Sequence, residues 1–316
     1  MRYREHADRS LRYGHLMNEY DVIATGLQFP EGPVVMPDGS IVLVEVKRGT
    51  ISRVDPTDGV IDVVARPGGG PNGAAVGPDG ALYVCNNGGF AWSEARGLTI
   101  PGLVAEDYSS GRIERIDMNT GEVEVLYAEV DGEPLKGPND IMFDSSGGFW
   151  FTDHGKTRAR TRDRGGLYYG RSDGSHVQEM AFPLDGPNGV GLSPEEDRVY
   201  VAETHQGAIF YWDLSGPGEL AGSSHGRFLA RPAGRKLFDS LAMDADGNVS
   251  VATIQTAGIS TFTPDGDELE FFPVDDPICT NICFGGDDMK SAYITLSGTG
   301  KLIRTEWPRP GLKLPF

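Results

Sequence analysis

Six oxygen-bearing side chains recur along this sequence, each at the start of a short apolar stretch. We call them the anchors, and they are Glu31, Asn72, Asn139, Asn188, Asp239 and Asn281. Carboxylate and amide oxygens are the ligands that hard divalent cations prefer, and calcium accepts both kinds in flexible numbers. The anchors therefore predict one divalent metal site if the fold brings them together. Ca²⁺ suits this ligand set best, and Zn²⁺, Mn²⁺ and Mg²⁺ are also compatible with it.

An alternative interpretation treats the anchors as turn residues, because Asn and Gly are common in turns. It accounts for the Pro-Asn-Gly triplets around Asn72 and Asn188. It does not account for Glu31 and Asp239, which occupy the same point of the pattern and would need a partner inside a protein. We therefore favour the metal-site hypothesis.

The spacing of the anchors indicates the elements that must position them. They lie 41 to 67 residues apart, which is the period of a four-stranded propeller blade with loop insertions. A second strand pattern follows each anchor, and third and fourth patterns complete most repeats. No long helical period is present. The sequence predicts an all-β, six-bladed β-propeller with four antiparallel strands per blade, in a single domain spanning residues 1–316.

The last repeat lacks an outer strand pattern after Trp307. We predict that residues 20–26 supply this strand and close the ring, because closure removes an exposed sheet edge. Residues 1–19 then form an N-terminal extension. In such a ring the anchors gather at one end of a central channel, which we call the mouth, and the loops after the second strands overhang it. Glu45 and Glu203 end second strands and are interpreted as structural pair partners.

The overhanging loops contain further candidates for substrate contact. The longest loop, residues 86–110, carries Phe90 and Trp92 beside paired glycines. It is predicted to be a lid with an apolar surface, and the alternative is an ordinary surface insertion. His154 and His205 follow the second strands of the third and fourth repeats. Each could face the substrate as acid or base, or could be a hydrogen-bonded loop residue.

One segment of the mouth concentrates positive charge. Five cations fall in nine residues, and they are Lys156, Arg158, Arg160, Arg162 and Arg164. We hypothesise that this basic loop attracts anionic substrates, such as a lactone bearing a carboxylate. The alternative is a solvated loop without a role in binding.

The overall composition restricts the partners and the location. The chain has 46 acidic and 28 basic residues and a formal net charge of −18, which argues against nucleic acid or an anionic membrane as a partner. No stretch is long or apolar enough to cross a membrane. Three cysteines cannot all pair within one chain, and the first ten residues lack the apolar core of a secretion signal, so we expect a cytoplasmic protein. The sequence does not specify an oligomeric state.

Four motifs carry a family resemblance. They are Glu31-Gly32-Pro33, Gly137-Pro138-Asn139-Asp140, Gly186-Pro187-Asn188-Gly189 and the run Phe238-Asp239-Ser240-Leu241-Ala242-Met243-Asp244. In this order they resemble the motifs of the regucalcin, gluconolactonase and luciferin-regenerating-enzyme family, over residues 26–307. The resemblance implies a six-bladed propeller with calcium or another divalent ion in its channel, and lactone hydrolysis in the best-known members. By position it implies that Glu31, Asn188 and Asp239 are metal ligands and that Asn139 binds metal, substrate or metal-bound water.

Two positions depart from the animal sugar lactonases of this family. Ser240 follows the bacterial form of the motif, where the animal enzymes usually have glycine. Gly137 lies two residues before Asn139, where those sugar lactonases place an arginine. The second departure disfavours an aldonolactone substrate and leaves the metal ligands unchanged.

Together these features predict a divalent-metal-dependent lactone hydrolase, gluconolactonase-like, that opens a small lactone to its hydroxy acid. Asp239, as general base or as the group that orients the attacking water, and Asn139 are the predicted catalytic residues. The predicted substrate contacts are Asn72, Asp140, Ser240, Asn281, Phe90, Trp92, His154 and His205. Two alternatives stay open: a metal-dependent esterase or organophosphorus hydrolase, and a calcium-binding propeller without enzymatic activity.

Overall fold

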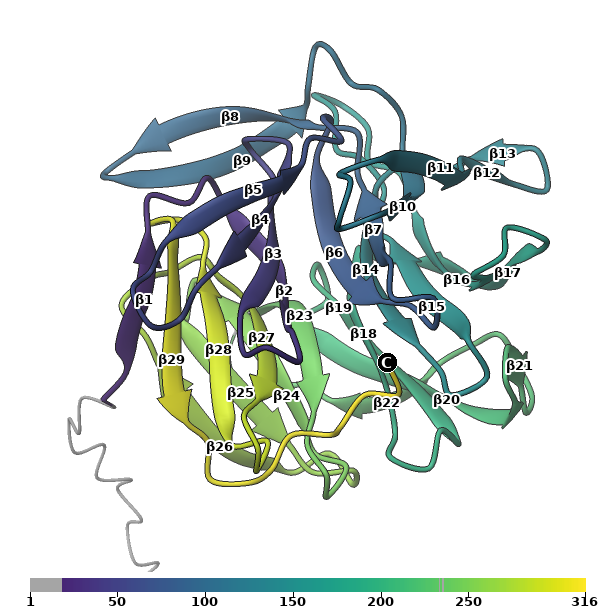
Figure 1. The fold of residues 1–316 in the computed structure, drawn as a ribbon. Coiled ribbons are helices and arrows are strands. Elements are labelled where there is room, and N and C mark those ends of the chain that lie inside the picture. The colour runs from purple at the N-terminus through teal and green to yellow at the C-terminus, as the bar shows by residue number, and fades with distance from the viewer. Residues whose placement is uncertain (1–18, 233, 235) are drawn as a thin grey trace, which may run out of the picture.

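The computed structural model describes residues 19–232, 234 and 236–316. Within this part of the chain all regular structure is β-strand, and the strands form six blades around a common axis (Figure 1). The predicted six-bladed β-propeller is therefore confirmed. Apart from Glu19, the N-terminal extension predicted for residues 1–19 lies outside the described residues. No helix in the described ranges is long and apolar enough to cross a membrane.

Each blade is an antiparallel sheet whose strands follow one another outward from the axis. Blade one contains β2 (Pro30–Val35), β3 (Ile41–Glu45), β4 (Thr50–Val54) and β5 (Ile61–Ala65). Blade two contains β6 (Pro71–Val76), β7 (Leu82–Asn86), β10 (Arg112–Ile116) and β11 (Val123–Tyr127). Blade three contains β14 (Pro138–Phe143), β15 (Gly148–Asp153), β16 (Gly165–Arg171) and β17 (Val177–Leu184).

The second half of the ring repeats this plan. Blade four contains β18 (Pro187–Leu192), β19 (Arg198–Glu203), β20 (Ala208–Gly216) and β22 (Arg227–Ala230), with β21 (Glu219–Leu220) also paired to β20. Blade five contains β23 (Leu237–Met243), β24 (Val249–Ile254), β25 (Gly258–Phe262) and β26 (Glu268–Pro273). Blade six contains β27 (Cys279–Gly285), β28 (Ser291–Leu296), β29 (Lys301–Glu306) and β1 (Asp21–Thr25).

Strand β1 closes the ring as predicted from residues 20–26. It runs antiparallel to β29, with Asp21 opposite Arg304 and Thr25 opposite Lys301. An Arg304 guanidinium N–H donates to Asp21 Oδ2 at 3.0 Å. The strand nearest the N-terminus thus covers the outer edge that β29 would otherwise leave exposed.

The core lies between neighbouring blades. Every residue of the second strands β3, β7 and β15 is buried, because a blade packs against a neighbour on both of its faces, and such strands read as continuous apolar runs. Tyr83 of blade two, for example, packs against Phe143 and Phe149 of blade three, with ring centres 5.0 and 5.8 Å away. This packing fixes the spacing of the blades and hence the width of the ring.

The innermost strands contact one another around the axis in the order β2, β6, β14, β18, β23, β27 and back to β2. Their backbones come too close for a side chain at two motif glycines. A Cβ on Gly73 would lie 2.5 Å from the Asn139 carbonyl oxygen, and one on Gly189 would lie 2.6 Å from the Leu241 backbone nitrogen. Glycine after the anchor therefore permits neighbouring innermost strands to meet backbone to backbone.

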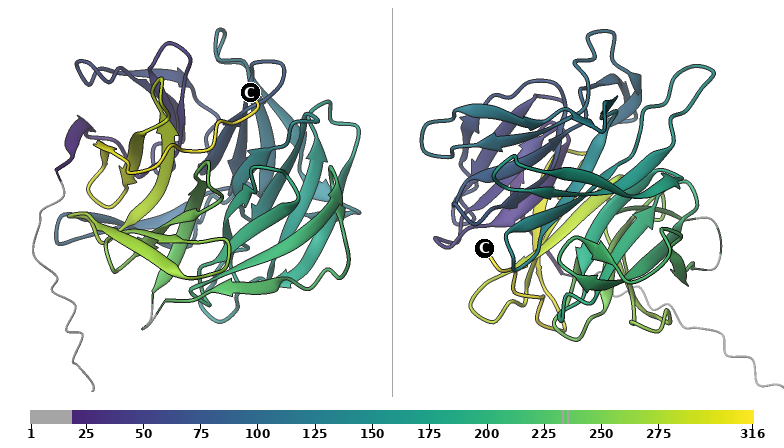
Figure 2. Two further views of the ribbon diagram at one scale, coloured as in Figure 1. Left: turned by 90° about the horizontal axis from the view of Figure 1, so that it is seen from below. Right: turned by 90° about the vertical axis from the view of Figure 1, so that its right-hand side faces the viewer.

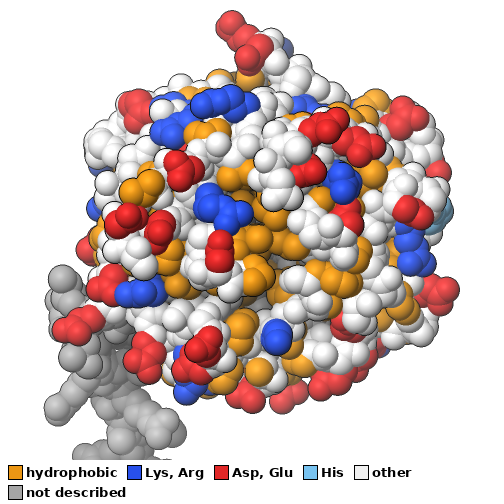
Figure 3. Space-filling model, viewed as in Figure 1, with side chains coloured by type: hydrophobic (Ala, Val, Ile, Leu, Met, Phe, Trp, Pro, Cys, Tyr) orange, Lys and Arg blue, Asp and Glu red, His pale blue; other side chains and the backbone are white. Residues whose placement is uncertain are grey.

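Residues 308–316 form a tail on the face opposite the anchors. Leu312 N donates to the Met243 carbonyl of blade five at 2.9 Å, and the ring of Phe316 meets that of Phe143 of blade three with centres 5.9 Å apart. The tail therefore crosses from blade six over blade five to blade three (Figure 2). On the side of the molecule shown in Figure 3, hydrophobic side chains gather in a central hollow and charged ones surround it.

Candidate functional site

All six anchors lie at one end of the innermost strands and all are buried. Each is the second or third residue of its strand, and in each blade the register with the second strand shifts at or beside the anchor. Such β-bulges are common next to active sites, because they redirect one side chain without ending the sheet. The same irregularity in every blade gives the anchors equivalent positions around the axis.

Direct contacts join anchors of neighbouring blades. Asn281 Nδ2 donates to Glu31 Oε2 at 2.8 Å, across the junction between blades six and one. Ser240 Oγ lies 3.4 Å from Asn188 Oδ1, across the junction between blades five and four. The structure thus brings four of the predicted site residues into two pairs.

Three buried acids share the mouth. Burial raises the pKa of Glu31. Burial, followed by the charge of Glu31, raises the pKa of Asp140 to about 7. The pKa of Asp239 lies well above its usual range because of burial first, then the charges of Glu31 and Asp140. The carboxylates are therefore close enough to repel one another, and the prediction that Glu31 and Asp239 are neighbours in space agrees with this coupling.

No cationic side chain in the part of the chain that the structure describes pairs with these acids to relieve this repulsion. Among the described residues, the ion pairs involve none of Glu31, Asp140 and Asp239. Asp140 instead accepts backbone N–H groups, from Ile141 at 3.0 Å and Val190 at 3.3 Å. Buried carboxylates without a countercharge are unfavourable, so this mouth suits a positively charged ligand.

The donor set at the mouth consists of carboxylates completed by amides. No group of three His, Cys, Asp or Glu side chains in the described ranges is arranged to hold a metal on its own. The predicted quartet has only two acids, Glu31 and Asp239, and its other members are the amides of Asn139 and Asn188. Asn188 is oriented by its Nδ2, which donates to Thr204 Oγ1 at 3.2 Å, and by Ser240 on its Oδ1. Thr204 is a contact that the sequence reasoning missed.

A second set of buried oxygens fixes the loops that lead into the anchors. At the end of four second strands, one side chain accepts a backbone N–H from the loop before the first strand of its own blade. These contacts are Glu45 with Gln28 at 2.7 Å, Asn86 with Gly70 at 2.9 Å, Asp153 with Gly137 at 2.7 Å and Glu203 with Asp185 at 3.1 Å. The structural interpretation of Glu45 and Glu203 is therefore confirmed. Asn86 and Asp153 could have been found by the same signal.

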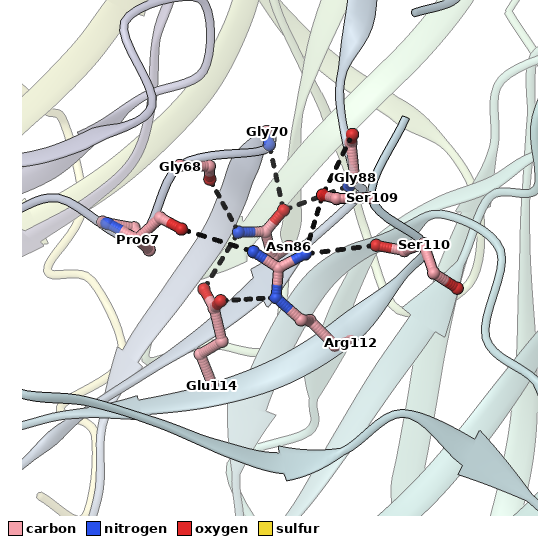
Figure 4. Close-up of polar contacts among 9 residues, drawn as sticks. All are labelled: Pro67, Gly68, Gly70, Asn86, Gly88, Ser109, Ser110, Arg112 and Glu114. Atoms are coloured by element: carbon pink, nitrogen blue, oxygen red, sulfur yellow. Dashed lines mark hydrogen bonds and ion pairs between the residues drawn. The ribbon is translucent and has the colours of Figure 1, made fainter. Parts of the chain in front are cut away.

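Figure 4 shows this arrangement in blade two, where it also holds the base of the longest insertion. Asn86 accepts from Gly70 N on one side and from Gly88 N, at 3.0 Å, on the other. Its Nδ2 donates to Glu114 at 2.9 Å, and Glu114 in turn pairs with Arg112 at 2.5 Å. One side chain thus connects the loop before Asn72 with the start of the insertion.

The two candidate histidines lie together at the mouth. The rings of His154 and His205 have centres 5.1 Å apart, edge to face. A Cβ on Gly186, two residues before Asn188, would overlap His205 Cδ2. Burial, then His205 and Lys156, lowers the pKa of His154 to about 3, and burial lowers that of His205. Both rings are therefore neutral at neutral pH and able to donate and accept hydrogen bonds.

The loop predicted as a lid contains a hairpin, β8 (Phe90–Ala95) and β9 (Leu98–Val104). It extends from blade two across blade one (Figure 1), and Thr99 N donates to the Gly298 carbonyl of blade six at 2.8 Å. Trp92 packs on Phe29, two residues before Glu31, with ring centres 5.0 Å apart. The hairpin therefore lies over the side of the mouth formed by blades one, two and six.

The basic loop is partly neutralised. Arg158 pairs with Asp163 at 2.9 Å, and both Arg162 and Arg164 pair with Asp185. Lys156 is buried and adds no charge to the surface. The loop therefore presents less positive charge to an anionic substrate than the hypothesis of five steering cations assumed, because Lys156 is buried and two acids offset part of the arginine charge.

The position of Gly137 is closed to a larger side chain. A Cβ there would lie 2.8 Å from the Gly155 carbonyl oxygen. His154 N donates to the Gly137 carbonyl at 2.9 Å, so the two loops are also joined by a hydrogen bond. An arginine at this position would require the loop after β15 to move.

Comparisons with known proteins agree with this architecture. Residues 29–298 match the family described as SMP-30/Gluconolactonase/LRE-like region. A gluconolactonase of Zymomonas mobilis is 26% identical over 315 residues, which cover 90% of this chain and 81% of that protein. Lactonase drp35 of Staphylococcus saprophyticus is 27% identical over 250 residues, or 79% of this chain and 70% of that protein.

The fold is also shared with a solved structure of regucalcin, a calcium-binding protein of Agrobacterium tumefaciens. The TM-score is 0.72 at 16% sequence identity, and the match covers 94% of this chain and 98% of that one. At this identity the likeness shows the fold alone. From the extent of the matched region, the chain belongs to the SMP-30/gluconolactonase/LRE-like family.

Proposed function

We propose that this protein is a divalent-metal-dependent lactone hydrolase. The observation that carries the proposal is the set of buried acids at the mouth, Glu31, Asp140 and Asp239, with amides beside them and, among the described residues, no cationic side chain paired to them. Two lactonases among the relatives support the reaction class. The name of the calcium-binding regucalcin supports Ca²⁺ as the ion.

Glu31, Asn139, Asn188 and Asp239 would hold the ion in this proposal. When bound, it would supply positive charge that polarises the lactone carbonyl and stabilises the oxyanion formed as water adds. Asn281 fixes one oxygen of Glu31 through the 2.8 Å hydrogen bond. Thr204 and Ser240 orient the amide of Asn188. The neighbouring side chains therefore preorganise the oxygens instead of leaving them mobile.

Asp239 is the proposed general base, since its carboxylate can accept a proton from the attacking water. Water adds to the carbonyl carbon, the bond to the ring oxygen breaks, and that oxygen takes the proton to become the hydroxyl of the product. Burial and the charges of Glu31 and Asp140 raise the pKa of Asp239, and a bound divalent ion would offset these charges and keep the carboxylate ionised, as a base requires. The neutral rings of His154 and His205 can hydrogen-bond substrate at the open side of the mouth.

The substrate proposed is a small lactone other than a simple aldonolactone. The tight contact of Gly137 with Gly155 leaves no room for the arginine of the animal sugar lactonases. Arg160 is exposed and could still favour an anionic lactone, so neutral and anionic lactones are separate arms of the test. A cytoplasmic location and a single domain spanning residues 1–316 stay proposals as well.

The test combines elemental analysis of the purified protein with a pH-indicator assay on neutral and anionic lactones with five- and six-membered rings, with and without chelator. We expect one divalent ion per chain, and turnover that chelator abolishes and added Ca²⁺ restores. Turnover that chelator leaves unchanged would refute the proposal that the reaction depends on a divalent metal ion. Hydrolysis of an organophosphorus ester with no lactone turnover would favour the esterase alternative, and metal binding without any turnover would favour a binding protein.

A further inference from the structure

Lys156, in the loop after β15, is fully buried in a site made by the hairpin insertion of blade two. The side chain is 1% exposed. Its Nζ donates to Asn87 Oδ1 at 2.8 Å and to the Gly89 carbonyl at 2.9 Å, and it lies 3.8 Å from the centre of the Phe90 ring. Two of the three ammonium donors are therefore hydrogen-bonded, and the face of the Phe90 ring attracts the positive charge. All three partners belong to the segment that begins the insertion.

The partners of Lys156 are neutral, which is unusual for a buried ammonium. Burial lowers the pKa of Lys156 to about 7, although the nearby charge of Asp153 favours the protonated form. Burying the charged ammonium therefore costs free energy, and the hydrogen bonds and packing between the loop and the insertion must offset this cost. A second link joins the same two segments, since Val104 N at the end of β9 donates to the Thr157 carbonyl at 3.1 Å.

The Phe90 ring begins a row of aromatic side chains that runs toward the first anchor. Phe90 and Trp92 have ring centres 6.0 Å apart, and Trp92 and Phe29 are 5.0 Å apart. We call these three rings the aromatic row. Phe29 lies two residues before Glu31, and Lys156 lies two residues after His154. The row therefore connects the loop that carries the histidine with the loop that leads into the proposed metal site.

We propose that Lys156 is a positioning residue that docks the β8–β9 hairpin over the mouth and thereby holds the aromatic row and His154 in place. Strand β8 is itself mostly exposed, so the hairpin is held through contacts at its two ends. At the base Lys156 is joined by Tyr108, whose OH donates to the Lys136 carbonyl at 2.6 Å, and at the tip Glu94 pairs with Lys47. Docking of the hairpin by Lys156 does not depend on which reaction the protein catalyses. Only the effect of this docking on turnover rests on the proposed function.

The test compares Lys156→Met with Arg160→Met. Both remove one positive charge from the same loop, but Arg160 is exposed. Lys156→Met keeps the apolar stem and leaves the Asn87 and Gly89 acceptors without their donor, a loss of about 1–3 kcal/mol for a buried group. Hairpin amides should then exchange hydrogen roughly 5- to 150-fold faster, provided that exchange follows local opening. Arg160→Met should leave their exchange unchanged.

Tryptophan fluorescence gives a readout that does not depend on activity. Trp150, Trp212 and Trp307 are buried, whereas Trp92 is partly exposed, so acrylamide quenching reports mainly on the hairpin. We expect quenching to increase about twofold or more in Lys156→Met, in line with local opening. Lys156→Arg should restore part of the protection. A Trp92→Phe background, in which the change should vanish, assigns the signal.

Kinetics with a hydrolysed lactone then tests the positioning role. Lys156→Met should raise KM by about tenfold with a smaller change in kcat, because remote positioning contacts chiefly hold the substrate. Equal exchange and quenching in Lys156→Met and the native protein would overturn the docking proposal. If Lys156→Met does not fold, Phe90→Leu, which removes only the ring, must loosen the hairpin for the proposal to stand. Absence of lactone turnover in the native protein would refute the proposed function and leave the docking result intact.

Discussion

The two ends of strand β23 hold two buried acids in contrasting surroundings. Asp239, at the mouth, meets the charges of Glu31 and Asp140. Asp244, just after the other end, accepts from Arg309 Nε at 2.9 Å and from Asn248 Nδ2 at 2.8 Å, as well as from backbone amides. Both carboxylates are excluded from water. Asp239 accepts hydrogen bonds from neutral groups of Asn188 and Ser240, whereas among the described residues only Asp244 of these two acids is paired with a cation, Arg309. A buried acid that is paired with a cationic side chain thus stabilises the fold. A buried acid without such a partner is instead available to bind a positively charged ligand.

The largest change in turnover is expected from a substitution at the mouth end of β23. Asp239→Asn keeps the shape and removes the base, so lactone kcat should fall by about 10²- to 10³-fold. The metal-free protein should be as stable as the native one or more so, because repulsion among the three acids is relieved. Steady-state kinetics and urea unfolding in chelator measure the two effects. An unchanged rate would remove Asp239 from the chemistry.

The matching change at the far end should have the opposite outcome. Asp244→Asn weakens the pairing with Arg309 and the acceptance of several N–H groups, so the free energy of unfolding should fall by about 2–4 kcal/mol. The kcat per folded molecule should stay the same. Asp246→Asn is the control, since Asp246 lies in the same turn but is exposed. A loss of kcat as large as that in Asp239→Asn would contradict the division of roles.

A third change should affect both properties together. Gly189→Ala places a Cβ 2.6 Å from Leu241 N and 2.9 Å from the Asp239 carbonyl oxygen. Relief of this overlap should cost about 1–3 kcal/mol of stability and displace Asp239, lowering kcat as well. Gly222→Ala has open space around it and should be neutral. Thermal unfolding and kinetics of both variants would show whether strand spacing sets the mouth.

The last expected effect is a pH dependence of stability that comes from Lys156. In the folded protein its pKa is lowered to about 7 from an ordinary value of 10.5, because of burial. Between these values the unfolded chain binds more protons, so the contribution to stability rises with pH, by up to about 1.4 kcal/mol per unit, and is lowest and constant well below pH 7. The titratable and charged groups near the Lys156 ammonium are Asp153, Arg158, His154 and Tyr108. Asp163 accepts from the backbone N–H of Lys156.

Urea unfolding at pH 7, 8 and 9 should therefore show the native protein gaining stability relative to Lys156→Met as the pH rises. Subtracting the variant removes the titration of the other groups, provided that they are unchanged. Parallel pH curves for the two proteins would show that Lys156 keeps an ordinary pKa in the fold.

The sequence was sufficient to predict the repeated strands because the signal is periodic. Each anchor begins its strand pattern, and the buried second strands are continuous apolar runs, so blade count, strand order and closure by residues 20–26 could all be predicted. The same periodicity placed the anchors at one mouth. Features that all six blades share can thus be predicted from a single sequence.

Features that occur in one blade only have no such periodic signal. Lys156 stands in a run of cations, which indicates a solvated loop, yet its acceptors lie almost 70 residues earlier, at Asn87 and Gly89. The ion pairs of Arg162 and Arg164 with Asp185 were missed for the same reason, since pairing between loops depends on their spatial arrangement. The residues 86–110 were predicted as a loop because their glycines obscure the strands of the hairpin.

The pairing of β1 with β29 also determines when the ring can form during synthesis. Asp21 and Arg304 meet across almost the whole sequence, so a nascent chain that still lacks β29 leaves β1 without its neighbour and blade six without its outer edge. Domains acquire their contacts from the N-terminus onward as the ribosome proceeds. The acids of blades one and five can therefore be brought together at the mouth only late in translation, after the last blade has emerged.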